Sequence, residues 1–345
     1  MIAAMKKEIF LRKDELQVKN LQSLYFGGGT PSILSGDEIN ALIDEVLKYF
    51  NFNHDIEITL EANPDDLDKN FLKSLSNSPV NRLSIGTQSF FDEDLKLMNR
   101  AHNASDAEGS IKRAQDFGFE NLSIDLIYGS PTSNLEIWKE NLNKTIALEI
   151  PHISSYALTV EPKTALENWI SMGKVISPEE EEQNKEFYYM IDFLKDHNFE
   201  HYEISNFAKP GFHSRHNSAY WKYNEYLGIG PSAHSYNGFD VRSWNVANNQ
   251  QYIKKLGSNL LAKEEEVLSQ EDQFNEMIMI GLRTTWGVDL ESLKNKFSEQ
   301  ILEKFTTEIK NKLNNGILMT ENNHLKIPEK HWFMADGIAS DLFMI

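Results

Sequence analysis

The feature that most constrains the fold of this chain is a repeated alternation between apolar, β-prone runs and segments with a helical period. The β-prone runs are LQSLYFG (21–27), DIEITLEAN (55–63), NRLSIGTQ (81–88), NLSIDLIYG (121–129), HISSYALTV (152–160) and HYEISNFA (201–208). Such alternation is typical of an α/β fold with a parallel sheet, wound into a barrel or left open. The segment 1–17 reads as a helix with no strand before it. We therefore expect an incomplete parallel β/α barrel whose first strand is missing.

The alternation ends near residue 209, where an aromatic and histidine-rich stretch without clear period begins. This change predicts two domains, a partial barrel over 1–208 and a smaller, mostly helical C-terminal domain over 209–345. The tail pattern of two helices and a short hairpin is typical of a winged-helix module. Two helix starts carry a capping-box pattern, Ser35 with Glu38 and Ser177 with Glu180.

Composition excludes several classes of function. The chain has a formal net charge of −18, which argues against a nucleic-acid partner because such a partner calls for a basic surface. No apolar run approaches the roughly 20 residues that span a bilayer, and the N-terminus has no cleavable signal pattern. We therefore expect a cytoplasmic protein with no integral membrane segment. The chain contains no cysteine, which rules out disulfides, a thiol nucleophile and thiolate metal ligands within it.

Polar residues or glycines stand at the C-terminal ends of four predicted strands. They are Gly28, Gly29 and Thr30 after the first strand, Glu61 and Asn63 after the second, Gln88 after the third, and Asp125 within the fourth. In a parallel β/α fold these strand ends meet at one edge, where ligands bind. Each residue alone is explained equally well as a turn or cap. Together they favour a ligand site at this edge.

The three consecutive glycines, Gly27–Gly29, cost backbone entropy and so indicate either a tight turn or a ligand close to the main chain. They fit neither the G-x-G-x-x-G pattern nor the phosphate loop that ends in G-K-[ST]. A nicotinamide-dependent oxidoreductase is set aside for the same reason. The neighbouring carboxylates and amide suit hydroxyl and ammonium groups better than a polyanion.

Four motifs in this order resemble the radical S-adenosylmethionine (SAM) family of oxygen-independent coproporphyrinogen III oxidases and their relatives: GGGTPSIL, LEANPDDL, IGTQSFFDEDLKLMNRAH and SIDLIYGSP. The resemblance runs over nearly the whole chain. It implies that Gly28, Gly29 and Thr30 line the site of the SAM amino group. It implies further that Glu61 and Gln88 hold polar groups of SAM such as the ribose hydroxyls. Arg100 would face the carboxylate or ribose of SAM, and Asp125 would bind its nucleoside.

The chain departs from this family in one respect. Family members carry C-x-x-x-C-x-x-C after the first barrel strand, and its thiolates hold a [4Fe–4S] cluster. By the resemblance, this motif falls just before residue 1, so we expect SAM and the cluster to belong to a full-length parent. The chain itself, without cysteine, is expected to hold no cluster.

The segment HNSAYW (216–221) resembles the HNxxYW motif of HemW-type haem chaperones, relatives that bind haem and pass it to other proteins. The resemblance implies that His216 ligates haem iron, with Asn217, Tyr220 and Trp221 around the macrocycle. His213 or Arg215 could pair with a haem propionate. From the residues alone, a second interpretation remains possible, a buried aromatic loop with a structural histidine.

The sequence therefore supports two possible functions. The first is a haem chaperone on a radical SAM scaffold, whose partners are haem and haem-acceptor proteins. The alternative is an oxygen-independent coproporphyrinogen III oxidase that decarboxylates two propionates. Whether the chain is an enzyme stays open at this point, and the HNSAYW segment is the feature that separates the two functions.

Overall fold

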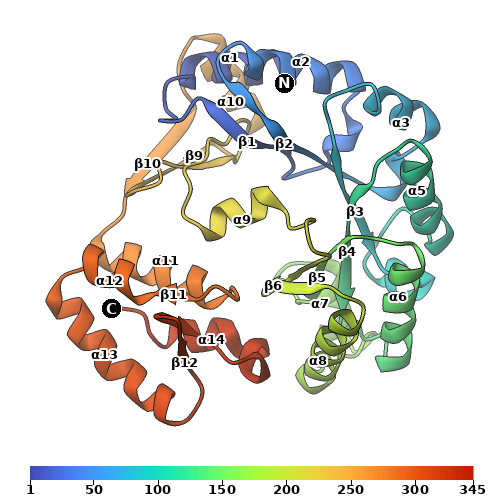
Figure 1. Ribbon diagram of the computed structural model, residues 1–345. Helices are drawn as coiled ribbons and strands as arrows, with labels where there is room; N and C mark the ends of the chain where they lie inside the picture. Colours follow the sequence, from blue (N-terminus) through green and yellow to red (C-terminus); the bar gives the residue numbers. More distant parts are fainter. Residues whose placement is uncertain (345) are drawn as a thin grey trace.

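The computed structural model describes residues 1–344 and contains a curled seven-stranded sheet with helices on its outer side (Figure 1). The strand order is β1 (Asn20–Phe26), β2 (Asn51–Ala62), β3 (Arg82–Gln88), β4 (Asn121–Tyr128), β5 (His152–Ala157), β7 (Asn206–Ala208) and β6 (Glu200–Glu203). Strands β1 to β5 pair in parallel throughout. The predicted α/β architecture, a partial parallel barrel, is confirmed.

The last β-prone run differs from the prediction. HYEISNFA forms two short antiparallel strands, β6 and β7, and β7 also pairs antiparallel with β5. The chain reverses between Glu203 and Asn206. The Glu203 carboxylate accepts hydrogen bonds from the Asn206 side chain and the Ser205 backbone, and these bonds close the turn. A single-strand interpretation missed this reversal because the β-prone pattern continues through it, although Ser205 and Asn206 are residue types common in turns.

In the barrel region α1 (Ile2–Arg12) precedes β1, and the other helices connect successive strands. These are α2 (Gly36–Leu47), α3 (Lys69–Leu75), α4 (Asp92–Leu97), α5 (Ala104–Asp116), α6 (Leu135–Ala147), α7 (Ala165–Ser171) and α8 (Glu180–Asp196), with 3₁₀ turns at Pro31–Ile33 and Pro64–Asp66. The capping box of Ser35 and Glu38 is confirmed at α2. The one expected at Ser177 is wrong, because α8 begins at Glu180 without a side-chain cap. Acidic residues in the first turn of α8 instead stabilise the helix through a favourable interaction with its dipole.

Alternation along each strand separates an apolar face from a polar one. Ile58, Leu60, Leu83, Ile85 and Ile124 are fully buried and belong to the core shared with the outer helices. Because successive side chains of a strand point to opposite faces, the residues between them face the concave side. That side carries polar groups, so the same strands that build the core also build the interior of the partial barrel.

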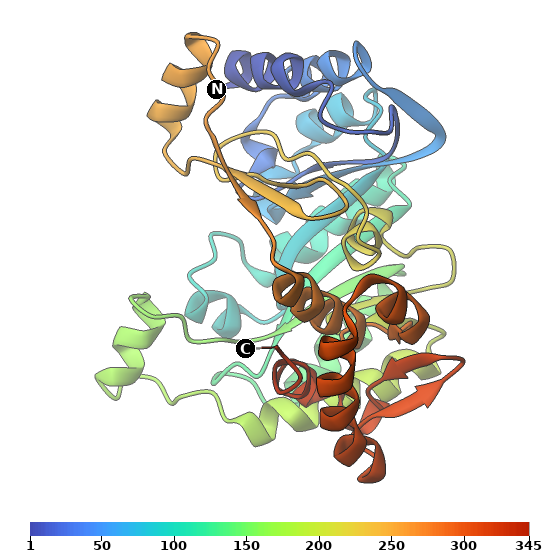
Figure 2. The same cartoon turned by 90° about the vertical axis from the view of Figure 1, so that its left-hand side faces the viewer.

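The segment after residue 209 returns to the first elements of the chain. It contains α9 (Arg215–Trp221), β8 (His234–Tyr236), β9 (Val241–Asn245), α10 (Asn249–Gly257) and β10 (Lys263–Val267). Figure 2 shows its amber strands and helix beside the blue N-terminal helices, while the red tail lies at the other end of the molecule. The division that we propose at residue 209 therefore separates parts of the chain that are in direct contact.

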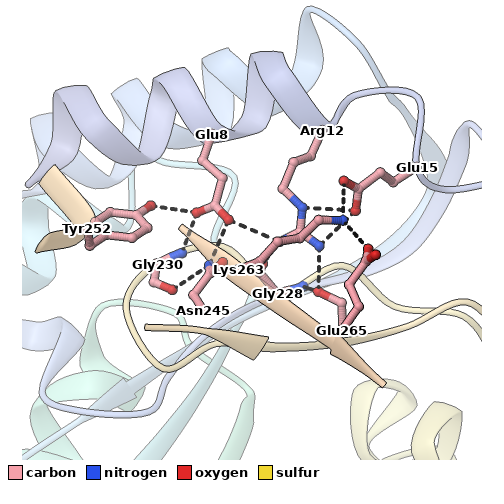
Figure 3. A network of polar contacts seen from close by, with 10 residues as sticks. Glu8, Arg12, Glu15, Gly228, Gly230, Asn245, Tyr252, Lys263 and Glu265 are labelled. Atoms are coloured by element: carbon pink, nitrogen blue, oxygen red, sulfur yellow. Dashed lines mark hydrogen bonds and ion pairs between the residues drawn. The ribbon is translucent and has the colours of Figure 1, made fainter. Parts of the chain in front are cut away.

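A buried polar network joins α1 to this later segment (Figure 3). Glu8 and Arg12, each 1% exposed, form an ion pair at 3.0 Å. Glu8 also accepts hydrogen bonds from three groups of the later segment, which are Gly230 N–H at 2.9 Å, Asn245 Nδ2 at 2.7 Å and Tyr252 OH at 2.5 Å. Arg12 donates to Gly228 O at 2.9 Å, Ser235 Oγ at 3.0 Å and Glu15 at 2.8 Å. Each buried charge thus has several partners.

The tail contains α11 (Gln270–Leu282), β11 (Val288–Asp289), α12 (Leu290–Lys296), α13 (Glu299–Asn314), β12 (Met319–Glu321), β13 (His324–Lys326), a 3₁₀ helix (Glu329–Met334) and α14 (Ala335–Ser340). Its sheet has the antiparallel order β11-β13-β12. Helices followed by a hairpin agree with the winged-helix-like expectation. Among residues 1–344, no helix combines the length and apolar character that a membrane crossing requires.

Candidate functional site

Different structural features explain why each of the three positions after β1 is a glycine. A side chain at Gly27 has no room, since a Cβ there would lie 2.4 Å from the Tyr25 ring and 2.6 Å from Glu61 Oε1. Gly28 has a φ of +76°, which other residues adopt only with strain. A Cβ on Gly29 would meet no atom of the described residues within 4 Å. Packing therefore explains Gly27 and the turn explains Gly28. Gly29 leaves exposed backbone without a side chain, which a ligand can approach.

Glu61 connects the glycine loop to β1. Its Oε2 accepts a hydrogen bond from the Gly28 N–H at 3.2 Å, and its Oε1 accepts one from the Tyr25 hydroxyl at 2.7 Å. Burial and the negative charge of Glu61 raise the pKa of Tyr25, so this hydroxyl remains a donor at neutral pH. The carboxylate keeps capacity for further donors, because an ionised carboxylate has about four lone-pair positions.

Asp125 of β4 faces the same interior as Glu61. Ser84 Oγ donates to Asp125 Oδ1 at 3.5 Å. Burial and the charge of Glu61 raise the pKa of Asp125 to about 6. The neighbouring negative charge disfavours ionisation of Asp125, and a ligand with an ammonium group or several hydroxyls relieves that repulsion. The pair is therefore suited to the kind of ligand that the sequence indicated.

Arg100 lies close enough to Asp125 for the two charges to interact. Burial lowers the pKa of Arg100, whereas the charges of Asp125 and Asp65 act in the opposite direction. Gln88 is buried at the end of β3 and has a φ of +65°, a left-handed conformation that is uncommon for a side chain other than glycine. Such local strain often accompanies a functional site. Thr30 is exposed and precedes the 3₁₀ turn Pro31–Ile33.

The HNSAYW segment forms helix α9, which lies within the arc of the curled sheet (Figure 1). Its first turn is held by Glu57 of β2, a buried carboxylate that accepts hydrogen bonds from Arg215 N at 2.9 Å and His216 N at 3.0 Å. Ser214 caps the helix by accepting a bond from Asn217 N at 3.2 Å. A carboxylate at a helix N-terminus satisfies free N–H groups and the helix dipole. Glu57 thereby places α9 against the barrel.

His216 meets β1 directly. Its ring stacks on Tyr25 with centroids 4.2 Å apart and an angle of 13° between planes. Ser23 Oγ lies 3.3 Å from His216 Nδ1, and the Tyr220 ring packs edge-on at 5.0 Å. When Nδ1 donates to Ser23, the lone pair is carried by Nε2. Burial and the positive charge of Arg82 lower the pKa of His216 to about 4, so the imidazole is neutral at pH 7.

The other residues of the motif lie in different directions. Tyr220 stays beside His216 and is 40% exposed. Trp221 instead lies near Arg283, whose guanidinium carbon is 5.7 Å from the indole centroid. The structure therefore brings His216 and Tyr220 together and places Trp221 towards the C-terminal tail.

The remaining histidines and the arginine of this region have partners elsewhere. His213 stacks on Tyr202 at 4.3 Å and pairs with Glu200 at 2.7 Å. Arg215 pairs with Asp55 at 2.5 Å. His234 lies in β8 with its ring 6.3 Å from that of Trp244. Neighbours in sequence thus occupy separate environments, and only His216 contacts β1.

Sequence reasoning missed four residues of the interior. They are Ser23, Tyr25, Glu57 and Arg82, all of which contact His216 or its helix or affect its charge state. Arg82 is 2% exposed, and its Nε has no hydrogen-bond partner within residues 1–344. The period-2 rule contained a signal, because Glu57 shares a strand face with Glu61, and Ser23 shares one with Tyr25.

Comparisons with known proteins identify the family. Residues 6–144 match the model of the radical SAM superfamily, and residues 268–334 match that of the HemN C-terminal domain. "Heme chaperone HemW" of Lactococcus lactis is 33% identical over 322 residues, 93% of this chain and 84% of the relative. The chain belongs to the HemW family of radical SAM proteins. HemW of Bacillus subtilis is 34% identical over 301 residues, 87% of this chain and 79% of the relative.

The fold of this HemW-family chain also resembles that of a solved enzyme, coproporphyrinogen III oxidase (HemN) from Escherichia coli. The TM-score is 0.82 at 22% sequence identity, over 99% of this chain and 82% of the enzyme. At this identity the likeness concerns the fold alone. It agrees with the partial barrel and the C-terminal tail described above.

Radical SAM membership implies SAM and an iron–sulfur cluster, and the residues present fit the two groups differently. The bare backbone at Gly29 and the paired carboxylates Glu61 and Asp125 fit an ammonium group and hydroxyls such as those of SAM. A cluster does not fit, because the chain has no cysteine. Moreover, residues 1–344 contain no group of three histidine or acidic side chains placed to hold a metal ion.

We expect the chain to bind no iron–sulfur cluster, because thiolates are the usual ligands of such clusters and none is present. The measurement is anaerobic reconstitution followed by gel filtration and iron determination. Background iron that washes away is the expected result. About four irons per chain, with the matching broad absorbance retained after filtration, would contradict the prediction.

We also expect weak or absent SAM binding by this HemW-family chain. Its SAM contacts would be ordinary hydrogen bonds, worth about 1 kcal/mol each. They must offset the entropy of ordering a flexible ligand. Isothermal calorimetry should show a dissociation constant well above the micromolar range, or no heat, with Glu61→Ala as the background. A micromolar constant would show that the polar residues suffice without an iron.

Proposed function

We propose that this HemW-family chain is a haem chaperone, which binds haem with His216 as the iron ligand and passes it to acceptor proteins. The observation that carries the proposal is the environment of His216 on α9. The imidazole is neutral at pH 7, because burial and Arg82 lower its pKa to about 4. A neutral imidazole is a common ligand of haem iron.

The surroundings of His216 support this role. Ser23 Oγ is placed to accept a hydrogen bond from the Nδ1–H and so leave the Nε2 lone pair for iron, as partners of metal-binding histidines usually do. Tyr220 offers an exposed aromatic ring beside the imidazole. In this proposal Asn217 of the HNxxYW motif acts beside the macrocycle, whereas Trp221, which lies near Arg283, is given no contact with it. Haem would supply the iron that the imidazole ligates, and the chain would supply orientation and apolar contact.

The SAM shell belongs to the same proposal. Its proposed members are Gly28, Gly29, Thr30, Glu61, Gln88, Arg100 and Asp125. The support is the hydrogen bond from the Gly28 N–H to Glu61 and the charge interactions of Asp125 with Glu61 and Arg100. Haem-acceptor proteins are proposed as partners because the relatives from Lactococcus lactis and Bacillus subtilis are haem chaperones.

Coproporphyrinogen III oxidation is not proposed for this chain. The likeness to the oxidase has 22% identity and therefore concerns the fold. The relatives at 30% identity or above include haem chaperones from several bacteria. No cysteine is present to hold the cluster that radical chemistry requires.

The deciding experiment is a titration of haemin into the purified chain, followed by absorbance in the Soret region. A saturable shift of the Soret band supports haem binding. The loaded chain is then mixed with an apo-haem protein such as apomyoglobin, separated by size, and the haem in each fraction is measured. Transfer supports the chaperone function. No Soret shift, or conversion of coproporphyrinogen III by the same preparation, would overturn it.

A further inference from the structure

The two ends of the interior, the glycine loop and His216, are joined by one continuous set of contacts. Gly28 N–H donates to Glu61, the Tyr25 hydroxyl donates to the other oxygen of Glu61, and the Tyr25 ring stacks under His216. The distances are 3.2 Å, 2.7 Å and 4.2 Å in that order. We propose that Tyr25 is a positioning residue, which orients the His216 imidazole and links it through Glu61 to whatever binds the glycine loop.

The stacking geometry gives Tyr25 this role. An imidazole attached by two single bonds can turn, and a ligand histidine binds iron well only in a limited set of orientations. Ser23 holds one atom of the ring, at Nδ1, and Tyr220 packs against its edge. The Tyr25 ring covers one face at an angle of only 13°. Turning the imidazole would therefore break the stack.

The hydroxyl of Tyr25 fixes the position of the ring that stacks on His216. The phenol is anchored at its far end by the hydrogen bond to Glu61, a charged acceptor. Glu61 is in turn oriented by the Gly28 N–H in a loop that is otherwise exposed. A ligand that orders this loop also orders Glu61 and Tyr25. Occupation of the glycine loop is thus expected to strengthen iron binding by His216, and the reverse effect must be equal in size.

The inference rests on the proposed haem function, and Tyr25→Phe tests it by removing one oxygen while keeping the stacked ring. We expect haemin to bind about fivefold more weakly, the change that one ordinary hydrogen bond is worth. Glu61→Ala is expected to act similarly, and the double variant Tyr25→Phe/Glu61→Ala to be no weaker than Glu61→Ala alone, because both changes break one contact. Glu61→Gln, which keeps an oxygen that can accept the bond, should restore most of the affinity.

Tyr226→Phe is the matched control. Tyr226 belongs to the same aromatic group, with its ring 4.7 Å from that of Tyr220. The tyrosine hydroxyl that donates to Glu61 is that of Tyr25. The electron paramagnetic resonance spectrum of the ferric haem complex adds a readout that a loss of stability would not move, since it responds to how the ligating imidazole is oriented. We expect Tyr25→Phe to shift or broaden the ferric signal and Tyr226→Phe to leave it unchanged.

The outcomes separate this inference from the function on which it rests. If the wild-type chain does not bind haemin, the proposed function fails and the inference fails with it. If the wild type binds haemin and His216→Ala does not, while Tyr25→Phe and Tyr226→Phe bind alike, only the role of Tyr25 is overturned. The link to the glycine loop is tested by calorimetry with SAM. Because the haem-free chain is expected to bind SAM weakly or not at all, measurable or tighter SAM binding by the haem-loaded chain supports the link, and no gain in SAM binding on loading with haem refutes it.

Discussion

Replacing Arg12 by alanine is expected to lower the free energy of unfolding by about 3–5 kcal/mol, the range for a buried ion pair that loses one partner. Arg12 and Glu8 are each 1% exposed and lie in the interface between α1 and the segment around Gly228 (Figure 3). The substitution leaves the Glu8 carboxylate buried without its cation and removes the donor to Ser235. Urea unfolding followed by circular dichroism measures the loss.

A second ion pair of the same spacing is the control for this prediction. Glu108 and Lys112 of α5 are also four residues apart, but they are 35% and 58% exposed. Lys112→Ala should therefore cost no more than about 0.5 kcal/mol. The double change Glu8→Gln/Arg12→Met, which removes both charges, should recover part of the loss. Equal unfolding midpoints for Arg12→Ala and Lys112→Ala would show that the network in the interface does not contribute as described.

The second large effect is expected for His216→Ala, which should weaken haemin binding by at least about 100-fold. Loss of an outer partner of a metal ligand already costs about 10- to 100-fold in affinity, and here the ligand itself is removed. Titration of haemin, followed by the position of the Soret band, measures the change. The variant should keep its fold, because Glu57 holds α9 through backbone N–H groups that alanine retains.

Two histidine variants test whether the effect belongs to His216. His213 is stacked on Tyr202 and paired with Glu200, and His234 lies in β8 beside Trp244. His213→Ala and His234→Ala are therefore expected to keep the wild-type Soret position and affinity. The ligand assignment is wrong if His216→Ala binds like the wild type while one of the other variants does not.

The partial barrel could be predicted because its signals are local. Periods of two and of 3.6 residues distinguish strands from helices, and Ser35 with Glu38 marks the start of α2 through contacts within one turn. The strand-end residues Glu61 and Asp125 could be assigned to one site because the carboxyl ends of parallel strands meet at one edge. Local signals also explain the errors. The capping pattern at Ser177 is present in the sequence although α8 begins at Glu180, and the β-prone run through Glu203 contains a reversal that hydrogen bonds to the Glu203 carboxylate close.

The sequence by itself determined the class of fold and, through its motifs, the family, and it predicted the edge where a ligand site is expected. Tertiary structure decided which of the polar residues act together. Glu57 holds the first turn of α9 although it lies 158 residues before Arg215 in the chain. Tyr25 reaches His216 only because α9 returns to β1 inside the sheet. Periodicity reports which face of its own element a residue occupies, and the meeting of two distant faces depends on the packing of the whole core.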